Sequence, residues 1–356
     1  MHKRLLNELT LSLTIAPDGP LLIKAGDRGG MDPTRPDMEF VRTWYNGRET
    51  VYLPGSSLKG MLRAHCEKIA RTVASAASET QMQTRLSCNP LKAEAKALDG
   101  GCGEKFSRDS QKSTPEETFR RSCFICQLFG NTALAGHARI TDAYPNLEQA
   151  IAQTPAAKGL DLPNNPAWAN LDEKGRRLLD PNYTEERHGV AIDRVYGSVA
   201  VGPFQFETAT QGVFTTTLTV RNFTTAQLGL LGLALRDLRQ QRLSIGFAKS
   251  RGLGRIKVAI SAATFRYPLG DLLPNLSTTH ISGVGALLYD LDETAAQAYG
   301  YPRVDQLPLS ARTLRSDDWG GQAVHFDETE AVVGGPLDEI WKAGVNAWKT
   351  VVQNGR

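Results

Sequence analysis

Four polar residues, Ser56, Ser57, Lys59 and Arg63, follow a Pro-Gly turn that ends at Gly55. The amphipathic run after this turn predicts a helix, and Ser56 or Ser57 would cap it. A helix start leaves backbone N–H groups and the positive end of the helix dipole facing outward. Lys59 and Arg63 are one helical turn apart, so their cations would share a face near that end. The stretch is therefore a candidate phosphate site, and a turn that merely begins a helix is the alternative.

Cysteines form a second chemical pattern. The two-residue spacing of Cys123 and Cys126 suits two thiolates on one metal ion, and Cys88 and Cys102 lie upstream. Four thiolates would close a tetrahedral structural site for Zn²⁺. His65 or Cys66 could replace Cys88 as the fourth ligand. Unpaired buried thiols are the alternative to any metal site.

A basic, glycine-rich segment covers residues 245–258. Its three glycines would let the backbone approach a ligand closely, and positive charge comes from Lys249, Arg251 and Arg255. Because the segment leads into a strand, it is neither a dinucleotide-binding fingerprint nor a Walker loop. A basic β-turn without a ligand is the alternative.

Strands and helices are expected around these segments. Alternating apolar residues predict a strand from Leu9 to Ile15, and helices are expected at 58–73 and 226–239. Further β-rich runs predict strands at 138–144, 190–197, 213–220 and 255–260. This order fits an α+β fold with a ferredoxin-like sheet, which is also the framework of RNA-recognition domains. Beyond residue 262, helices are expected at 294–298 and 337–352.

Two long polar stretches interrupt this order. Residues 74–117 are too long for a simple connection, so we interpret them as an insertion that the cysteines would staple. Residues 146–186 contain four prolines and a basic cluster. They are either an arm that touches a partner or a loop without fixed structure.

The composition limits the possible classes of protein. The chain has 356 residues, of which 41% are hydrophobic and 22% charged, which allows a real core and argues against general disorder. The net charge is only +3, so a nucleic-acid surface would have to come from local clusters. Five cysteines without a signal peptide do not indicate a disulfide framework. No segment resembles a membrane helix, so we expect a cytoplasmic protein with no membrane partner.

Four motifs occur in an order that is typical of one protein family. They are residues 53–60, residues 123–130 with their Leu-Phe-Gly ending, residues 188–194, and residues 246–255 with Lys-Ser-Arg-Gly-Leu-Gly. Together they resemble the repeat-associated (RAMP) proteins of CRISPR systems, and most closely the backbone subunit of type III and type IV effector complexes. The resemblance covers about residues 5–262.

This resemblance implies a modified RNA-recognition fold that assembles, copy by copy, into a filament along a guide RNA (crRNA). Target DNA or RNA and other CRISPR effector subunits would be further partners. Residues 1–73, 118–145 and 187–262 would form the palm core. Residues 74–117 would form a zinc-stapled web, residues 146–186 a thumb-like β-hairpin that separates guide–target pairs, and residues 263–356 a C-terminal extension. The guide would be bound by Gly55, Ser56, Ser57, Lys59, Arg63, Arg187, His188, Arg194, Lys249, Ser250 and Arg251.

The resemblance also raises the question of catalysis. Type III relatives cut target RNA with an aspartate in their first Gly-rich loop, which corresponds to residues 26–37 here. Asp32 matches that position best, with Asp27 and Asp37 as poorer candidates. Mg²⁺ or Mn²⁺ would assist such a carboxylate. The length of the chain and its tail after Phe265 favour the type IV branch, whose backbone subunit has no established cutting role. We therefore expect a non-catalytic RNA-binding subunit, with a target-RNA nuclease that uses Asp32 as the alternative.

A stand-alone guide-processing endoribonuclease of the same superfamily is a second alternative. Such an enzyme would need an acid–base set near the guide. The candidate residues His65, His137 and His188 form no recognisable set of this kind.

Overall fold

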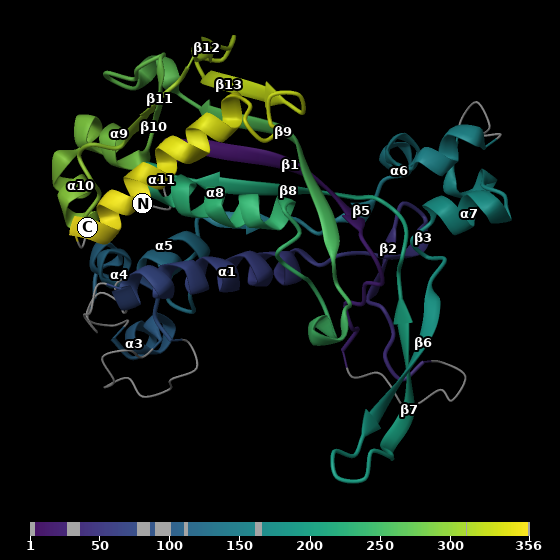
Figure 1. The fold of residues 1–356 in the computed structure, drawn as a ribbon. Coiled ribbons are helices and arrows are strands. Elements are labelled where there is room, and N and C mark those ends of the chain that lie inside the picture. The colour runs from purple at the N-terminus through teal and green to yellow at the C-terminus, as the bar shows by residue number, and fades with distance from the viewer. Residues whose placement is uncertain are drawn as a thin grey trace.

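The computed structural model describes residues 4–26, 36–76, 86–89, 101–109, 113–160, 166–310 and 312–354. Helices and strands surround one large antiparallel sheet, which confirms the expected α+β class (Figure 1). Asp27 and Asp32 lie outside the described residues. Within the described ranges, no helix combines the length and the apolar character that crossing a membrane requires.

Seven strands form the large sheet: β1 (Glu8–Pro17), β4 (Ala138–Ile140), β5 (Tyr144–Pro145), β8 (Phe214–Arg221), β9 (Ile256–Tyr267), β12 (Arg315–Ser316) and β13 (Gln322–Asp327). Their order is β12-β13-β9-β1-β8-β4, with β5 also paired to β8. β1 lies inside the sheet because its alternate residues are apolar, and Leu9, Leu11, Leu13 and Ile15 are all buried.

The central part of this sheet has a ferredoxin-like order. The chain passes from β1 through α1 (Gly55–Ala76) to β4 and β8, and then through α8 (Thr225–Arg239) to β9. The resulting spatial order, β9-β1-β8-β4, is the one expected for two βαβ halves that share one antiparallel sheet. β13 pairs with β9, so the C-terminal extension enlarges the same sheet.

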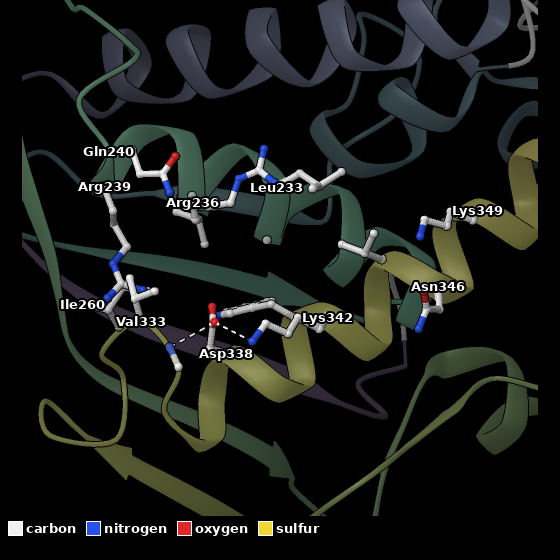
Figure 2. Close-up of a pocket in the computed structure, with 15 residues that line it drawn as sticks. Leu233, Arg236, Arg239, Gln240, Ile260, Val333, Asp338, Lys342, Asn346 and Lys349 are labelled. Carbon is white, nitrogen blue, oxygen red and sulfur yellow. Dashed lines mark hydrogen bonds and ion pairs between the residues drawn. The ribbon is translucent and has the colours of Figure 1, made fainter. Parts of the chain in front are cut away.

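Helix α8 is buried along nearly all of its length. It begins with a capping box of Thr224 and Gln227, and it packs between α1 and the last helix, α11 (Pro336–Asn354) (Figure 1). Its approach to α11 is close, since a Cβ atom on Gly229 would lie 2.0 Å from the carbonyl oxygen of Gly344. Nearer the end of α8 the two helices border a cleft (Figure 2).

A long β-hairpin projects from the body of the molecule (Figure 1). It consists of β6 (Glu185–Ile192) and β7 (Val199–Thr208). The strand expected at 190–197 is thus partly present, but it lies outside the core sheet. Its apolar side chains are exposed, Val190 to 45% and Ile192 to 63%. A shorter hairpin, β2 (Arg42–Tyr45) and β3 (Arg48–Val51), leads to α1.

The position expected for the thumb-like hairpin, residues 146–186, was wrong. The described part of that stretch forms α6 (Leu147–Gln153), η1 (Pro155–Gly159), η2 (Trp168–Asn170) and α7 (Glu173–Leu179). These short helices have a small apolar cluster of their own, which includes Leu147, Leu171 and Leu179. Helical structure prevails here because asparagine and aspartate caps, such as Asn146 and Asp172, stabilise the starts of α6 and α7.

The remaining elements lie between α1 and β4 and later in the chain. Between α1 and β4 they are α3 (Cys102–Asp109), α4 (Pro115–Arg121) and α5 (Phe124–Phe129). Later in the chain they are η3 (Lys249–Arg251), η4 (Gly270–Leu272), β10 (His280–Ser282), α9 (Val284–Leu291), α10 (Glu293–Tyr299) and β11 (Gln306–Pro308). Helices α10 and α11 confirm the two helices expected in the tail.

Candidate nucleic-acid interface and metal centre

The start of α1 differs from the sequence-based expectation. The helix begins at Gly55, so Ser56 and Ser57 lie in its first turn and neither is its cap. The N–H of Gly55 donates to Oδ1 of Asp142 at 2.7 Å. A carboxylate therefore already occupies one donor of the helix start. Only glycine fits at Gly55, because a Cβ atom there would lie 2.4 Å from the carbonyl oxygen of Ile140.

A cluster of cations lies beside this helix start. Lys59 is partly buried, burial lowers its pKa, and the positive charges of Arg63 and Arg139 lower that pKa further. Neither Lys59 nor Arg139 forms an ion pair within the described part of the chain. Uncompensated positive charge at a half-buried position favours a bound anion. This is the strongest phosphate candidate in the structure.

Arg63 is the member of the cluster that is engaged inside the protein. Its guanidinium donates to the carbonyl oxygen of Gly130 at 3.0 Å, to Oε1 of Glu67 at 3.0 Å and to Sγ of Cys126 at 3.6 Å. These contacts join α1 to α5. The sequence suggested Arg63 for phosphate binding, but these internal contacts exclude it from the candidate phosphate-binding surface.

The glycine-rich loop before β9 is held by the N-terminal part of the chain. The N–H of Phe247 donates to the carbonyl oxygen of Leu22 at 2.7 Å, and the N–H of Gly254 donates to the carbonyl oxygen of Pro20 at 2.9 Å. Gly246 has a φ of 87°, and a Cβ atom there would lie 2.1 Å from the carbonyl oxygen of Leu22. Close backbone contact thus fixes the loop, which presents the exposed turn η3.

Turn η3 carries Lys249, Ser250 and Arg251, all exposed. The guanidinium of Arg251 lies 5.3 Å from the ring centre of Phe204 on β7, within the range of a cation–π contact. The structure therefore brings this basic turn against the middle of the projecting hairpin, where Phe204 pairs with Gly189. The ring of Phe204 is partly buried, because it also packs against Gly189.

The hairpin carries three further predicted residues. Arg187 and His188 lie on β6, where Arg187 pairs with Glu185 at 3.3 Å and Nε2 of His188 lies 3.7 Å from Oε1 of Glu186. Arg194 lies in the exposed turn between the two strands and forms no ion pair with any described residue. Beside it, Val195 and Tyr196 are 81% and 83% exposed.

The predicted residues therefore fall into two groups, one at the start of α1 and the other formed by turn η3 and the hairpin. The start of α1, turn η3 and the hairpin lie in the same half of the molecule in Figure 1. Contacts link turn η3 to the hairpin, and the N–H of Gln205 donates to Oδ2 of Asp37 at 2.8 Å near the first Gly-rich loop. No contact in the described ranges joins Arg194 at the hairpin tip to Lys59.

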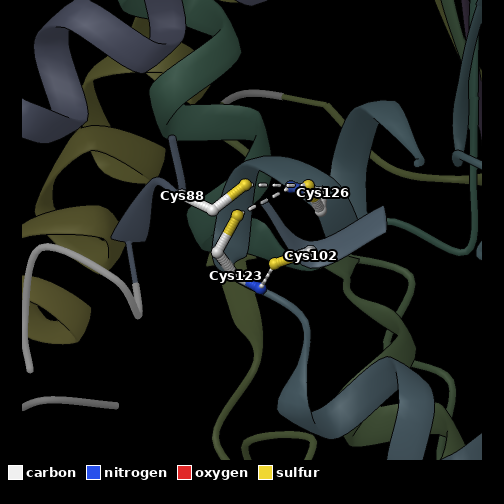
Figure 3. A group of neighbouring side chains, drawn as sticks. All are labelled: Cys88, Cys102, Cys123 and Cys126. Carbon is white, nitrogen blue, oxygen red and sulfur yellow. Dashed lines mark hydrogen bonds between the residues drawn. The ribbon is translucent and has the colours of Figure 1, made fainter. Parts of the chain in front are cut away.

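The four cysteines predicted as metal ligands come together in the fold. Cys88, Cys102, Cys123 and Cys126 are all buried, and their Sγ atoms lie within 4.8 Å of one another (Figure 3). Cys123 caps α5, and the first turn of that helix brings Cys126 to the same side. Cys102 begins α3, which brings the insertion back to the core.

The geometry of this cluster fits a zinc ion. The Sγ atoms of Cys88 and Cys126 are 3.7 Å apart, close to the edge of about 3.8 Å that a Zn–S length of about 2.3 Å gives in a tetrahedron. The N–H of Cys123 donates to Sγ of Cys102 at 3.3 Å, and the N–H of Cys126 donates to Sγ of Cys123 at 3.4 Å. Such donors stabilise thiolates around a metal.

The two alternatives for the fourth ligand are wrong. His65 forms a contact of 2.8 Å between its Nε2 and Oδ2 of Asp237. Cys66 is not part of the cluster, and burial raises the pKa of its thiol. By contrast, Sγ of Cys88 lies within 4.8 Å of the other three Sγ atoms. Cys88 therefore completes the set.

Two contributors to these sites were missed by reasoning from the sequence. Arg139 lies in a strand that was expected, but its charge was not connected with Lys59 because the two residues meet only when β4 lies beside α1. Phe204 was not considered as a contact residue, because its position under Arg251 depends on the hairpin. The only available signal was that both residues flank recognised motifs.

Comparisons with known proteins place these observations in context. The family model described as the RAMP superfamily matches residues 15–257, more than half of the chain. A chain of a solved structure, the "Type IV-B CRISPR Complex", is similar at 15% sequence identity with a TM-score of 0.39. The match covers 71% of the present chain and 90% of that chain. The search of curated proteins gives no match.

Proposed function

The chain belongs to the RAMP superfamily, and on that premise we propose that it is an RNA-binding backbone subunit of a CRISPR ribonucleoprotein. In this proposal several copies lie along one crRNA, hold its phosphates and present its bases for pairing with target nucleic acid. Other effector subunits complete the complex. Sequence would be read by base pairing, so the protein needs to recognise only the backbone of the guide.

The cation cluster at the start of α1 is the observation that carries this proposal. Lys59 is partly buried, has two arginines as its charged neighbours and forms no ion pair with a described carboxylate. Arg139 contributes a second cation from β4, and the hydroxyl groups of Ser56 and Ser57 lie in the first helical turn. A phosphate of the guide would supply the missing negative charge.

Turn η3 and the hairpin would extend the guide-binding surface. Lys249 and Arg251 would contact further phosphates. The hairpin tip, with Val195 and Tyr196, would take the thumb role that separates guide–target pairs at intervals. Each copy would add a few such contacts, so affinity would rise steeply with assembly on one RNA.

A zinc ion is the cofactor we propose for the cysteine cluster. Its role would be structural, because four thiolates leave no open position for a substrate. The cysteines come from the segment at Cys88, from α3 and from α5, so one ion would tie these parts of the insertion to the core. Metal binding and folding of this region would then be coupled.

Coexpression of the full chain with a CRISPR array tests the proposed function. We expect the protein to copurify with crRNA, and light scattering should show several copies per guide. Lys59→Gln and Arg139→Gln should weaken RNA binding for all guide sequences, and each should reduce the slope of log affinity against log salt by about 1. Lys68→Gln is the matched control, since Lys68 is exposed on the same helix.

Two results would contradict the proposal. One is a protein that purifies as a monomer without RNA and does not bind crRNA when it is added. The other is binding that depends on the guide sequence and is unaffected by Lys59→Gln.

A further inference from the structure

The cleft between α8 and α11 has the character of a second binding site, apart from the candidate nucleic-acid interface. Its volume is about 480 Å³, within the range of small-molecule sites. Its walls are the last turns of α8, the exposed side of α11, and the segment at Val333 (Figure 2). It does not include the start of α1, turn η3 or the hairpin, so its role goes beyond the proposed function.

Positive charge dominates the walls of this cleft. Four cations line it, Arg236, Arg239, Lys342 and Lys349, against the single carboxylate of Asp338. Asp338 already accepts from the N–H of Gly334 at 3.1 Å and pairs with Lys342 at 3.3 Å.

Two of these cations, Arg239 and Lys349, form no ion pair with a described residue, and of the two only Arg239 is partly buried. Arg236 pairs with Asp237 at 2.7 Å, whereas Arg239 has no ion pair within 4.0 Å among the described residues. Figure 2 shows Arg239 extending from the end of α8 toward Ile260 and Val333. Its guanidinium is thus partly buried at the junction of this cleft with a neighbouring one that shares those two residues.

Trp341 also lines the cleft and is only 5% exposed. Its indole N–H forms no hydrogen bond with any described residue, but the nitrogen has almost no accessible surface, so a ligand in the cleft does not reach it. Trp341 therefore adds apolar surface to the wall.

The rest of the lining defines the body of such a ligand. Leu233, Ile260 and Val333 provide apolar surface, and Gln240 and Asn346 provide amide groups that can donate and accept. We propose that the cleft binds a small organic anion of about mononucleotide size. Its phosphate or carboxylate lies on Arg239, and its flat or apolar body lies along the aliphatic side chains.

Adenosine monophosphate is a suitable probe, with adenosine and inorganic phosphate as its two halves. Calorimetric titration of the full chain, freed of nucleic acid, should show saturable binding of the monophosphate at least about tenfold tighter than of either half. Arg239→Gln should weaken this binding about tenfold or more, because a charged hydrogen bond is lost. Arg239→Lys, which keeps the charge, should restore part of it.

A further variant makes the test specific. Arg242→Gln should leave binding unchanged, because Arg242 is an exposed arginine three residues away that does not line the cleft. Circular dichroism should show that Arg239→Gln is folded.

Three outcomes would overturn the inference. They are no saturable binding of the monophosphate, equal binding of inorganic phosphate alone, and binding that Arg239→Gln does not change. A short single-stranded RNA that binds through Arg239 while the monophosphate does not would also overturn it, since the cleft would then belong to the nucleic-acid surface. Loss of crRNA binding by Lys59→Gln with retention of monophosphate binding would separate this site from the proposed guide site.

Discussion

The guanidinium of Arg63 donates a hydrogen bond to Sγ of Cys126 at 3.6 Å. The same side chain holds the carbonyl oxygen of Gly130, just after α5. The helix that begins at the candidate phosphate site is therefore fixed, further along its length, to the segment with two of the four thiols. Loss of a metal ion from the cluster should therefore also disturb α1, the helix that would bind the guide.

Replacement of one metal ligand gives the first prediction. Cys126→Ser should remove the zinc, which metal analysis should otherwise find at about one ion per chain. We expect the free energy of unfolding to fall by about 4 kcal/mol or more, because loss of a structural metal is among the largest single-residue effects. Cys66→Ala is the control: Cys66 is buried but outside the cluster, so the ion should stay. Equal metal content in the wild type and Cys126→Ser would rule out the site.

Lys59 should show opposite effects on stability and on RNA binding. The folded-state pKa of Lys59 lies below the ordinary value of 10.5, so folding disfavours the charged form of this side chain. The resulting loss of stability is greatest at neutral pH. It disappears as the pH rises from the folded-state pKa to 10.5. Lys59→Met should therefore raise Tm at pH 7, on the order of 1 °C for a partly exposed group, and weaken crRNA binding. Thermal unfolding from pH 7 to pH 10 should show the gain shrinking. A lower Tm at pH 7 would contradict this reading.

Two glycines of α1 should respond in opposite ways to the same substitution. Gly55→Ala should destabilise the protein by about 1–3 kcal/mol, because the added Cβ atom would press on the carbonyl of Ile140. Gly60→Ala should stabilise it by about 0.5–1 kcal/mol, since Gly60 lies inside the helix with nothing within 4 Å of the added atom. Urea unfolding measures both, and a neutral Gly55→Ala would mean that the backbone approach is looser than described.

The hairpin tip should matter for the guide–target duplex and not for the stability of the protein. Val195 and Tyr196 are exposed, so replacing both with serine should change the free energy of unfolding by less than about 0.5 kcal/mol. In assembled complexes we expect wild-type protein to leave target bases unpaired at regular intervals, which chemical probing of the target strand detects. The double variant should lose that periodic signal, and an unchanged pattern would remove the thumb role from this hairpin.

Asp32 provides the test for catalysis. If the chain is a non-catalytic subunit, as its length and its tail suggested, the wild type and Asp32→Ala should leave the same amount of target RNA intact in the presence of Mg²⁺ or Mn²⁺. Guide binding should also be the same in both. Cleavage by the wild type that Asp32→Ala abolishes would instead support the target-RNA nuclease.

Local patterns predicted much of the fold. Period-two alternation identified β1, a β-rich run identified β8, and apolar stripes identified α1 and α8. The spacing of Cys123 and Cys126 anticipated the cysteine cluster. The hairpin was misplaced because its position came from the resemblance. The β-rich run at 190–197 indicates a strand without indicating its neighbours, and β6 and β7 pair only with each other among the described strands.

Contacts between distant residues could not be predicted in the same way. Asp142 accepts from Gly55 across 87 positions of sequence, so nothing near the Pro-Gly turn indicated that a carboxylate would lie at the helix start. Arg63 had the right spacing for phosphate, but its direction is set by Gly130 and Glu67. The availability of a charged side chain depends on partners that only the tertiary fold brings to it.

The outer strands of the large sheet have a consequence for a protein whose copies would crowd along one RNA. β12 has two residues, and on the other side β4 and β5 have three and two. Long unpaired strands invite edge-to-edge pairing and aggregation, whereas such short ones offer few free donors and acceptors. If copies assemble along an RNA as proposed, they could therefore be packed at high local concentration while their sheets stay separate, and the spacing between them would be left to the RNA and to side-chain contacts.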